Sequence, residues 1–434
     1  MTADLSKATL KATIVGAGPA GLLLAHYLLQ RRYQVSLYDR RPDPRQIDAD
    51  QRRSFPISLQ TRGQKAIQGV PGLEAAVANH SLFCQGTVIH NGKKSRDIRR
   101  QEKVMAVDRN QMVLTFLEEL TARYQAPELT VEFDCTCDRL DSRAQTLTFL
   151  DAKDEAFSVS YDRLIGADGA NSQIRTQLAE RDGFNYEQSY VSDAYKSLFL
   201  NRTNLAEGVD LAVDRIHASN INNNTRIILA PQPNDQLHGA FIFDAQNNPL
   251  AAFTHPDQIR AYFAENLPTF YPLLSAAEAE ALIDRPVARL LTVRCDRFHH
   301  GEHILLIGDA IHAVSPSIGQ GCNAALQDVE IFNQLLDSHQ DDWAKAITQF
   351  SELRRADAYA LRELSDYSFP RSKPLVAEFF LRLLLSRKLH QWFPQRFKPF
   401  LFDQVLETDL AYSKILQDHQ AWIDRVKQSM AATE

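Results

Sequence analysis

The feature that most constrains this sequence is a glycine-rich turn near its start. An apolar run, KATIVG, leads into Gly16-Ala17-Gly18-Pro19-Ala20-Gly21, and a nearly continuous apolar stretch follows. The alternating run QVSLYD then ends at Asp39. This order predicts a strand, a tight turn, a buried helix and a second strand, the unit that binds dinucleotides. The alternative is an ordinary α/β unit whose turn happens to be rich in glycine.

The spacing of the glycines suits a diphosphate. Gly16 permits the tight turn, Gly18 leaves the backbone open to a pyrophosphate, and Gly21 lets the helix pack against the strand. The N-terminus of the helix offers free N–H groups and a positive dipole end to the phosphates. Asp39, 18 residues after Gly21, can accept hydrogen bonds from both ribose hydroxyls. We therefore predict nucleotide binding.

The remaining sequence predicts more than one folded unit, since 434 residues exceed a typical domain. Strand patterns occur at VEFDCTCDRL, QTLTFLD and FSVSYDRLIGAD, and a helix with Asp108 as its N-cap is expected within residues 103–125. From about 183 to 286, alternating runs predict a second, mostly antiparallel sheet. HILLIGDA at 303–310 predicts a buried parallel strand, and the chain beyond about 320 is expected to be mostly helical.

Composition excludes several classes of function. The net charge is −6, which disfavours nucleic-acid binding. The five cysteines are scattered, so a disulfide framework is not expected and a reducing compartment is. Cys135-x-Cys137 has no second pair nearby, so we predict no metal site. The first ten residues are polar and do not form a secretory signal, which predicts a cytoplasmic protein.

A strongly apolar segment begins at Ala377, with the sequence AEFFLRLLLSRKL. Arg382 and Arg387 interrupt it, so it is too short for a membrane span. We favour a packed amphipathic helix, and the alternative is a helix that lies on a membrane surface.

Two further motifs place an acid at the end of a strand. Asp168-Gly169 follows the apolar run RLIGA, and Gly308-Asp309 follows HILLI. Such an acid can bind a ribose or ribityl hydroxyl, although Asp168 could also simply cap the helix that follows it. Gly319-Gln320-Gly321 begins a helix whose free N–H groups can stabilise negative charge on a ring. We interpret His312 as structural.

The sequence as a whole resembles the single-component flavoprotein aromatic hydroxylases, the para-hydroxybenzoate hydroxylase-like FAD monooxygenases. The resemblance rests on GAGPAG at 16–21, GADG at 166–169 and GDAIH at 308–312. It sharpens toward the kynurenine 3-monooxygenases through YDRRPDPR at 38–45, the segment from Arg53 to Gly63, VRCDRFH at 293–299 and LHQWFPQRFKPF at 389–400.

This resemblance implies an α/β fold: a dinucleotide-binding (Rossmann-like, GR2-type) FAD domain, a mostly antiparallel substrate domain and C-terminal helices. The expected FAD-binding domain is discontinuous, with residues 1–75, 101–182 and 287–365. The expected substrate domain comprises 76–100 and 183–286, and the helical segment 366–434. The resemblance also implies NAD(P)H as a transient co-substrate, O₂, a flavin C4a-hydroperoxide that hydroxylates an aromatic small molecule, and a monomer or homodimer.

The resemblance further implies roles for individual residues. Pro316 and Tyr367 are the expected catalytic residues. The expected cofactor-binding residues are Gly16, Gly18, Ala20, Gly21, Asp39, Arg40, Arg53, Arg109, Asp168, Gly308, Asp309, Gly319, Gln320, Gly321 and Asn323.

Departures from the family pattern concern the substrate. Where the kynurenine enzymes carry an arginine that holds the substrate carboxylate, this chain has Thr87. The family's tyrosine partner would fall near Arg99-Arg100, and its asparagine-tyrosine pair appears as Asp366-Tyr367. We therefore predict a substrate other than kynurenine. The alternatives are a kynurenine 3-monooxygenase proper, a same-fold epoxidase or reductase of an isoprenoid-like substrate, and a binding protein without redox turnover.

Overall fold

The computed structural model describes residues 10–48, 51, 53–92, 94–204, 211–222, 225–370 and 372–431. The prediction that the first ten residues form no secretory signal cannot be compared with the structure at residues 1–9, which lie outside this set. The outer ends of the predicted domains, 1–9 and 432–434, also lie outside it.

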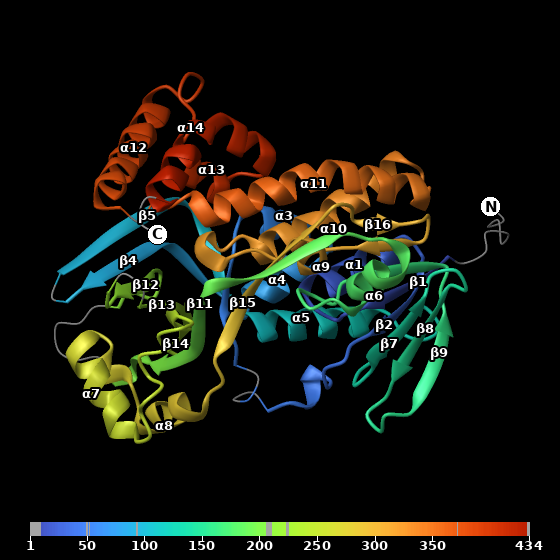
Figure 1. Ribbon diagram of the computed structural model, residues 1–434, viewed down its shortest axis with the longest axis horizontal. Helices are drawn as coiled ribbons and strands as arrows, with labels where there is room; N and C mark the ends of the chain where they lie inside the picture. Colours follow the sequence, from blue (N-terminus) through green and yellow to red (C-terminus); the bar gives the residue numbers. More distant parts are fainter. Residues whose placement is uncertain are drawn as a thin grey trace.

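A six-stranded, mostly parallel sheet forms the part of the molecule nearest the N-terminus (Figure 1). Its strands in spatial order are β16 (His299–His300), β17 (Ile304–Leu306), β10 (Arg163–Gly166), β1 (Lys11–Val15), β2 (Gln34–Tyr38) and β6 (Leu129–Glu132). Every neighbouring pair is parallel except β16 with β17. Helix α1 (Pro19–Gln30) is buried along nearly its whole length, as the apolar sequence predicts. The carboxyl ends of β17, β10, β1 and β2 therefore lie side by side.

An eight-stranded sheet forms the opposite part of the molecule. Its strands in order are β15 (Ala288–Cys295), β11 (Tyr186–Asn201), β14 (Gln236–Asp244), β13 (Arg226–Gln232), β12 (Ile216–Asn220), β4 (Leu82–Asn91), β5 (Lys94–Asp108) and β3 (Pro56–Leu59). Only β12 and β4 run parallel, which confirms the predicted antiparallel character. Helices α7 (Pro256–Asn266) and α8 (Ala276–Asp284) cover one face through a core that includes Phe241 and Phe263.

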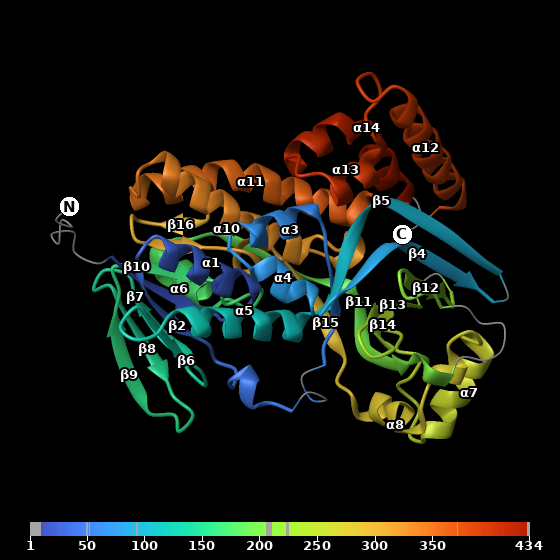
Figure 2. The same ribbon diagram turned by 180° about the vertical axis from the view of Figure 1, so that it is seen from behind.

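The rest of the chain is mostly helical after residue 320, as predicted. The remaining helices are α3 (Thr61–Gln68), α4 (Leu73–Ala78), α5 (Arg109–Arg123), α6 (Gln173–Asp182), α9 (Asp309–His312), α10 (Gly321–Ser338), α11 (Trp343–Tyr367), α12 (Lys373–Trp392), α13 (Leu401–Glu407) and α14 (Tyr412–Ala431). Helices α12, α13 and α14 form a group beside β5, seen from behind in Figure 2. A core that includes Phe379, Leu401 and Trp422 holds this group together. The predicted α/β fold class is thus confirmed, whereas the division into domains at the predicted boundaries stays a prediction.

Two predicted strands are broken in the structure. VEFDCTCDRL divides into β6 and β7 (Thr136–Asp141), because Asp134 takes a left-handed conformation with φ of 55°. The two halves lie in different sheets, since β7 pairs with β8 (Thr146–Leu150) and β9 (Ala156–Ser160). FSVSYDRLIGAD likewise divides into β9 and β10. The single strand that would carry Cys135 and Cys137 on one face is therefore wrong, although both side chains are buried.

The prediction that the apolar segment from Ala377 is a packed amphipathic helix is correct for only one face of α12. Phe379 and Leu383 of α12 are buried, but Leu381, Leu384 and Leu385 are each more than half exposed. Within the described residues, no helix is long and apolar enough to cross a bilayer.

A buried arginine joins the C-terminal helices to the rest of the fold. Arg62 of α3 donates hydrogen bonds to the carbonyls of Val405 (2.5 Å) and Leu410 (2.6 Å), and its guanidinium lies 4.1 Å from the ring centroid of Tyr412. Its side chain is fully buried, and burial lowers the pKa of the guanidinium. Both carbonyls belong to the segment around the link between α13 and α14.

We expect Arg62→Met to loosen residues 401–431, because it removes two hydrogen bonds from a charged donor. The loss should be about 2–4 kcal/mol, seen as faster hydrogen exchange in α13 and α14. Lys65→Met is the matched control on α3, since Lys65 pairs with Asp409 at the surface. It should cost less than about 1 kcal/mol. Equal exchange in the two variants would contradict this assignment.

Candidate active site

The first glycine-rich motif folds as the sequence predicts. Gly16 has φ of 110°, and a Cβ there would lie 2.4 Å from the carbonyl oxygen of Ala167. A Cβ on Gly21 would lie 2.0 Å from the carbonyl oxygen of Gly16. Gly18 differs, because a Cβ there would meet no protein atom within 4 Å. Gly16 and Gly21 are thus needed for packing, whereas Gly18 faces open space at the start of α1.

Asp39 lies at the end of β2 and is buried. Its Oδ2 accepts a hydrogen bond from the Ala17 N–H (2.7 Å), and Arg41 donates to the carboxylate through its backbone and its guanidinium (2.8–3.0 Å). Burial alone would raise the pKa of this carboxyl, but the bonds from Arg41 and Ala17 lower it below its usual value. Arg40, the predicted cofactor residue, is exposed. The guanidinium that bonds Asp39 belongs to Arg41. Its position two residues after Asp39 is the only sign of this contact in the sequence.

Asp168 serves the helix that follows it. Its Oδ2 accepts hydrogen bonds from the N–H groups of Gln173 (2.7 Å) and Ile174 (3.2 Å), so the capping interpretation describes a real contact. Its Oδ1 is buried and has no partner among the described residues. Burial raises the pKa of this carboxyl. One oxygen is therefore committed to α6, and the other remains available to a hydroxyl donor.

The third motif lies against the first. Gly308 has φ of 65°, and a Cβ there would lie 3.3 Å from Cβ of Ala20 and 3.2 Å from Cβ of Ala325. Since Gly16 also contacts the backbone of Ala167, all three motifs meet at the carboxyl ends of β1, β10 and β17. The structure thus brings together the stretches that carry Gly16, Asp168 and Gly308.

The loop after α9 is held by side-chain amides. Gln320 is fully buried, donates to Oε1 of Gln60 and accepts from the Tyr412 hydroxyl (2.6 Å). Asn323 accepts from the Gln60 N–H (2.7 Å) and donates to the Ser58 and Gly319 carbonyls (3.0 and 2.9 Å). Both side chains are therefore used within the protein, and the Gly319 N–H donates to the Pro316 carbonyl (3.0 Å). The loop would thus offer the backbone N–H groups of Gln320 and Gly321 to a ligand.

The two expected catalytic residues lie on neighbouring segments. Pro316 is exposed, and the adjacent Ser317 hydroxyl donates to the Ser365 carbonyl at the end of α11. Tyr367, two residues further along α11, is half-buried and lines a cavity of about 610 Å³. The described lining of this cavity also includes Asp366, His312, Arg294, Tyr359 and Arg362, but no residue of the Pro316–Gly319 loop.

The two predicted FAD-contacting arginines lie next to strands β3 and β5, where Pro56 pairs in register with Asp108. The Arg53 guanidinium lies 5.0 Å from the ring centroid of Phe199 on β11. Arg109 begins α5, directly after its N-cap Asp108, as predicted. Burial raises the pKa of the Cys322 thiol to about 12; the charge of Asp309 adds to this rise and that of Arg109 opposes it.

A buried ionic network supports this region, and sequence reasoning identified only one of its members. His312 Nε2 lies 2.5 Å from Asp328 Oδ2, Arg354 Nε lies 2.7 Å from Asp328 Oδ1, and the Gly308 N–H donates to Asp328 at 3.2 Å. Burial would lower the pKa of His312, yet Asp328 raises it; burial would raise the pKa of Asp328, yet His312 and Arg354 lower it. The structural interpretation of His312 agrees with this geometry. Asp328 carried no motif signal because it lies inside a helix.

These observations fit a dinucleotide cofactor. Gly18 and the N-terminus of α1 face open space, Asp39 lies at the next strand end, and Asp168 keeps a buried oxygen without a partner among the described residues. Asp309 follows Gly308 at the adjacent strand end.

Comparison with known proteins agrees with this geometry. The family model described as "FAD binding domain" matches residues 9–358. Kynurenine 3-monooxygenase of Flavobacterium psychrophilum is 30% identical over 422 residues, which cover 94% of this chain and 90% of that protein. Violacein synthase of Chromobacterium violaceum is 27% identical over 420 residues, covering 94% and 96% of the two chains.

Solved structures share the fold. A 2-methyl-3-hydroxypyridine-5-carboxylic acid oxygenase aligns with a TM-score of 0.69 at 21% identity, covering 83% of this chain and 91% of that one. A tetracycline destructase aligns with a TM-score of 0.59 at 17% identity, covering 96% and 98%.

We expect Gly18→Val to weaken FAD binding about tenfold or more without unfolding the protein, because its side chain would enter open space rather than protein. FAD content after purification and the thermal midpoint of the apoprotein measure the two effects. Gly21→Ala is the contrasting variant: its Cβ meets the Gly16 carbonyl, so the apoprotein itself should lose roughly 1–3 kcal/mol. A Gly18→Val protein that retains full FAD would contradict the placement of the diphosphate.

Proposed function

This chain belongs to the FAD-binding-domain family of flavoprotein monooxygenases that also contains the kynurenine 3-monooxygenases, and on that premise we propose that it hydroxylates an aromatic or other electron-rich small molecule. NAD(P)H and O₂ are the proposed co-substrates. The observation that carries the proposal is the meeting of the Gly16, Asp168 and Gly308 motifs at one edge of the parallel sheet.

FAD supplies the redox chemistry when bound, and this chain's residues bind and orient it. We assign the diphosphate to the open space at Gly18, the ribose to Asp39 and the ribityl chain to Asp309. The N–H groups of Gln320 and Gly321 are assigned to the ring carbonyl region, where donors stabilise developing negative charge; the Gly319 N–H donates instead to the Pro316 carbonyl. The eight-stranded sheet would cover the ring and exclude water from it.

The proposed substrate is not kynurenine. Thr87 on β4 stands where the resembling enzymes place the arginine that holds the substrate carboxylate, and a hydroxyl does not replace a bidentate cation. Asp366 adds a carboxyl at the position of their asparagine. Burial raises the pKa of Asp366, and Arg362 opposes that rise. Both changes disfavour an anionic amino-acid substrate.

A screen of NAD(P)H consumption tests this function. With the FAD-loaded protein, we expect at least one neutral or phenolic aromatic compound to accelerate NAD(P)H oxidation, and kynurenine to have little effect. Incorporation of oxygen-18 from labelled O₂ into the product separates hydroxylation or epoxidation from reduction. Rapid hydroxylation of kynurenine would overturn the substrate proposal, and a protein purified without FAD would overturn the function itself.

We place the protein in the cytoplasm as a monomer or homodimer, with peripheral contact to an anionic membrane surface through α12. Leu381, Leu384 and Leu385 on this helix are 57%, 53% and 51% exposed, and Trp392 is 68% exposed. Residues 373–398 contain six Lys or Arg and a single acid, Glu378, in a chain with a net charge of −6. An exposed apolar ridge flanked by basic residues is typical of helices that lie in the membrane interface.

We expect the protein to bind phosphatidylcholine vesicles that contain phosphatidylglycerol, and to bind pure phosphatidylcholine vesicles weakly. Leu381→Glu with Leu385→Glu should reduce co-sedimentation about tenfold or more and abolish any blue shift of Trp392 emission, because two charged groups would have to enter the apolar layer. Leu353→Glu is the matched control, at an equally exposed leucine (51%) on α11. If the protein binds no vesicles but forms a dimer that the double variant dissociates, the apolar ridge is instead the contact surface for a second copy of the chain.

A further inference from the structure

The cavity of about 610 Å³ that Tyr367 lines lies between α11, α14 and one edge of the eight-stranded sheet. Its described walls come from β11, β15, α9, α11 and α14, and they include no residue of β4, which carries Thr87. Four strands separate β15, at the edge of the sheet, from β4. The cavity is therefore distinct from the proposed substrate surface at Thr87, and its volume is that of a small-molecule site, about 300–1,000 Å³.

One basic side chain in this cavity lacks an acid. Of the basic residues in the described lining, Arg362 and His312 are paired with acids, whereas Arg294 forms no ion pair within the described part of the chain. The Arg294 guanidinium lies 3.8 Å from the ring centroid of Tyr359, whose hydroxyl donates to the Cys295 carbonyl (3.0 Å). Stacking uses the face of a guanidinium, whereas its N–H donors lie in its plane. The ring thus positions the guanidinium and leaves its donors to a ligand.

The acids of the lining are already offset by other cations. Glu187, which faces the β15 guanidinium in the register of β11 and β15, lies 3.8 Å from Arg362, and Asp366 lies 3.9 Å from the same side chain. Glu363 pairs with Lys427 of α14. The guanidinium on β15 is therefore the charge in the described lining that has no counterpart, and it favours an anionic ligand.

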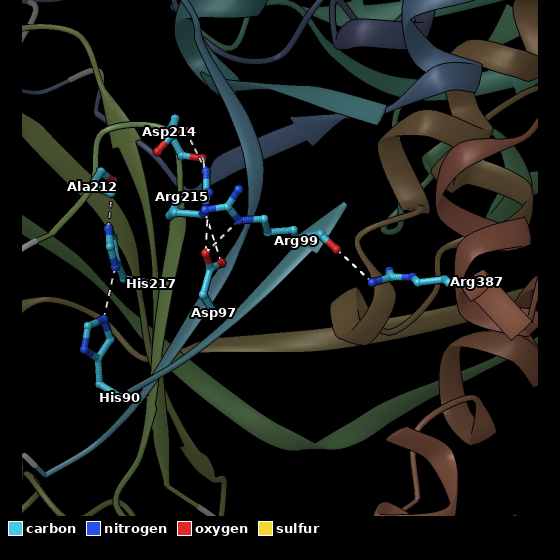
Figure 3. Close-up of polar contacts among 8 residues, drawn as sticks. All are labelled: His90, Asp97, Arg99, Ala212, Asp214, Arg215, His217 and Arg387. Carbon is cyan, nitrogen blue, oxygen red and sulfur yellow. Dashed lines mark hydrogen bonds and ion pairs between the residues drawn. The ribbon is translucent and has the colours of Figure 1, made fainter. Parts of the chain in front are cut away.

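Other arginines of this sheet are matched by acids. Figure 3 shows Arg215, directly before β12, between Asp97 and Asp214, with nitrogen–oxygen distances of 3.1 and 2.6 Å. Arg99 on β5, also in Figure 3, pairs with Asp97 at 3.2 Å. At these positions the fold supplies the carboxylate itself. Arg294 differs, because it lines a cavity and has a tyrosine ring in place of an acid.

The rest of the cavity extends along α11 and is less polar. Tyr367 lies eight residues after Tyr359 on this helix, which corresponds to about 12 Å along the helix axis. Val293, Ala360 and Leu416 add apolar surface to the lining. An elongated ligand with an anionic end and an aromatic remainder would match this arrangement of groups.

The cavity wall is continuous with the supports of the cofactor edge. His312 lines the cavity, and its Nε2 lies 2.5 Å from Asp328, which accepts the Gly308 N–H. Nδ1 of the same imidazole is buried and has no partner among the described residues. A ligand in the cavity would therefore lie against the supports of the cofactor edge rather than at the edge itself.

We propose that this cavity is a second ligand site, which binds a small aromatic carboxylate as an effector rather than as the substrate. The ligand carboxylate accepts hydrogen bonds from the Arg294 guanidinium, and its ring lies along α11 toward Tyr367. This inference goes beyond the proposed function and does not depend on it, because binding requires no redox step.

The test is a calorimetric titration of the FAD-loaded protein with 3-phenylpropionate, which joins a carboxylate to a ring without a hydroxyl group. We expect the wild-type protein to bind it, and Arg294→Gln to weaken binding about tenfold or more, because the charged donor is lost. Arg289→Gln is the matched control: this exposed arginine is also on β15, 4.9 Å from the ring centroid of Tyr190, but is not in the described lining. It should bind the probe as wild type does.

Two further arms identify the cavity and the charge. Ala356 is exposed on α11 and lines the cavity, so Ala356→Trp should fill it and weaken binding about tenfold or more while FAD content and the thermal midpoint stay as in wild type. The uncharged 3-phenylpropanamide should bind the wild-type protein at least tenfold more weakly than the carboxylate does. Equal affinity for the amide and the carboxylate would contradict the assignment to the guanidinium.

The outcomes separate the two proposals. The second site is overturned if the wild-type protein does not bind 3-phenylpropionate, or if Arg294→Gln and Arg289→Gln bind it equally. Binding beside the flavin gives that second result, together with the same change of flavin absorption in both variants. The proposed function survives these results, because NAD(P)H consumption tests it. A protein that consumes no NAD(P)H with any aromatic compound leaves the titration result unchanged.

Discussion

The close approach of three backbone segments is the constraint on which the rest of this structure depends. Gly16 contacts the backbone of Ala167, Gly21 contacts the carbonyl of Gly16, and Gly308 lies against Ala20. A side chain at Gly16 or Gly21 would overlap neighbouring backbone atoms, so the strand ends could not meet. Because these strands are parallel neighbours, their carboxyl ends form one edge, and residues from across the sequence can address a single elongated ligand.

The buried ionic network under this edge removes charged groups from water, which is unfavourable, but it also fixes the position of a strand end. Asp328, His312 and Arg354 are almost completely removed from water, and replacing such groups by apolar side chains often stabilises proteins. Here the carboxylate also accepts the Gly308 N–H, so it fixes the turn that presents Asp309. The same carboxylate joins α9, α10 and α11. The network is therefore better explained by orientation of the strand end than by stability.

Local signals in the sequence predicted local structure well. The glycine spacing predicted the first turn, and Asp108 before an amphipathic run predicted the N-cap of α5, whose side chain accepts from the N–H groups of Asn110 and Gln111. The failures have physical causes that single-sequence patterns do not contain. A left-handed Asp134 divides an alternating run, and no motif marked Arg41, the neighbour of Arg40, as the residue that bonds Asp39. The contact between Asp108 and His238 spans 130 positions, so only the tertiary fold creates it.

The resemblance to the kynurenine 3-monooxygenases implies that the proposed substrate surface departs more from the family pattern than the cofactor edge does. The charges on this surface explain why a nearby guanidinium would not replace the missing arginine. Thr87 pairs in register with Ile98, and Arg100 follows two residues later on β5. Burial lowers the pKa of Arg100, while the carboxyls of Glu407 and Asp403 oppose that effect. Its charge is therefore offset by acids from α13 rather than directed at a ligand. Binding at such a surface would be more favourable for a neutral or weakly acidic ring than for an amino acid with a fixed carboxylate. The ring brings no full charge that must be desolvated and paired.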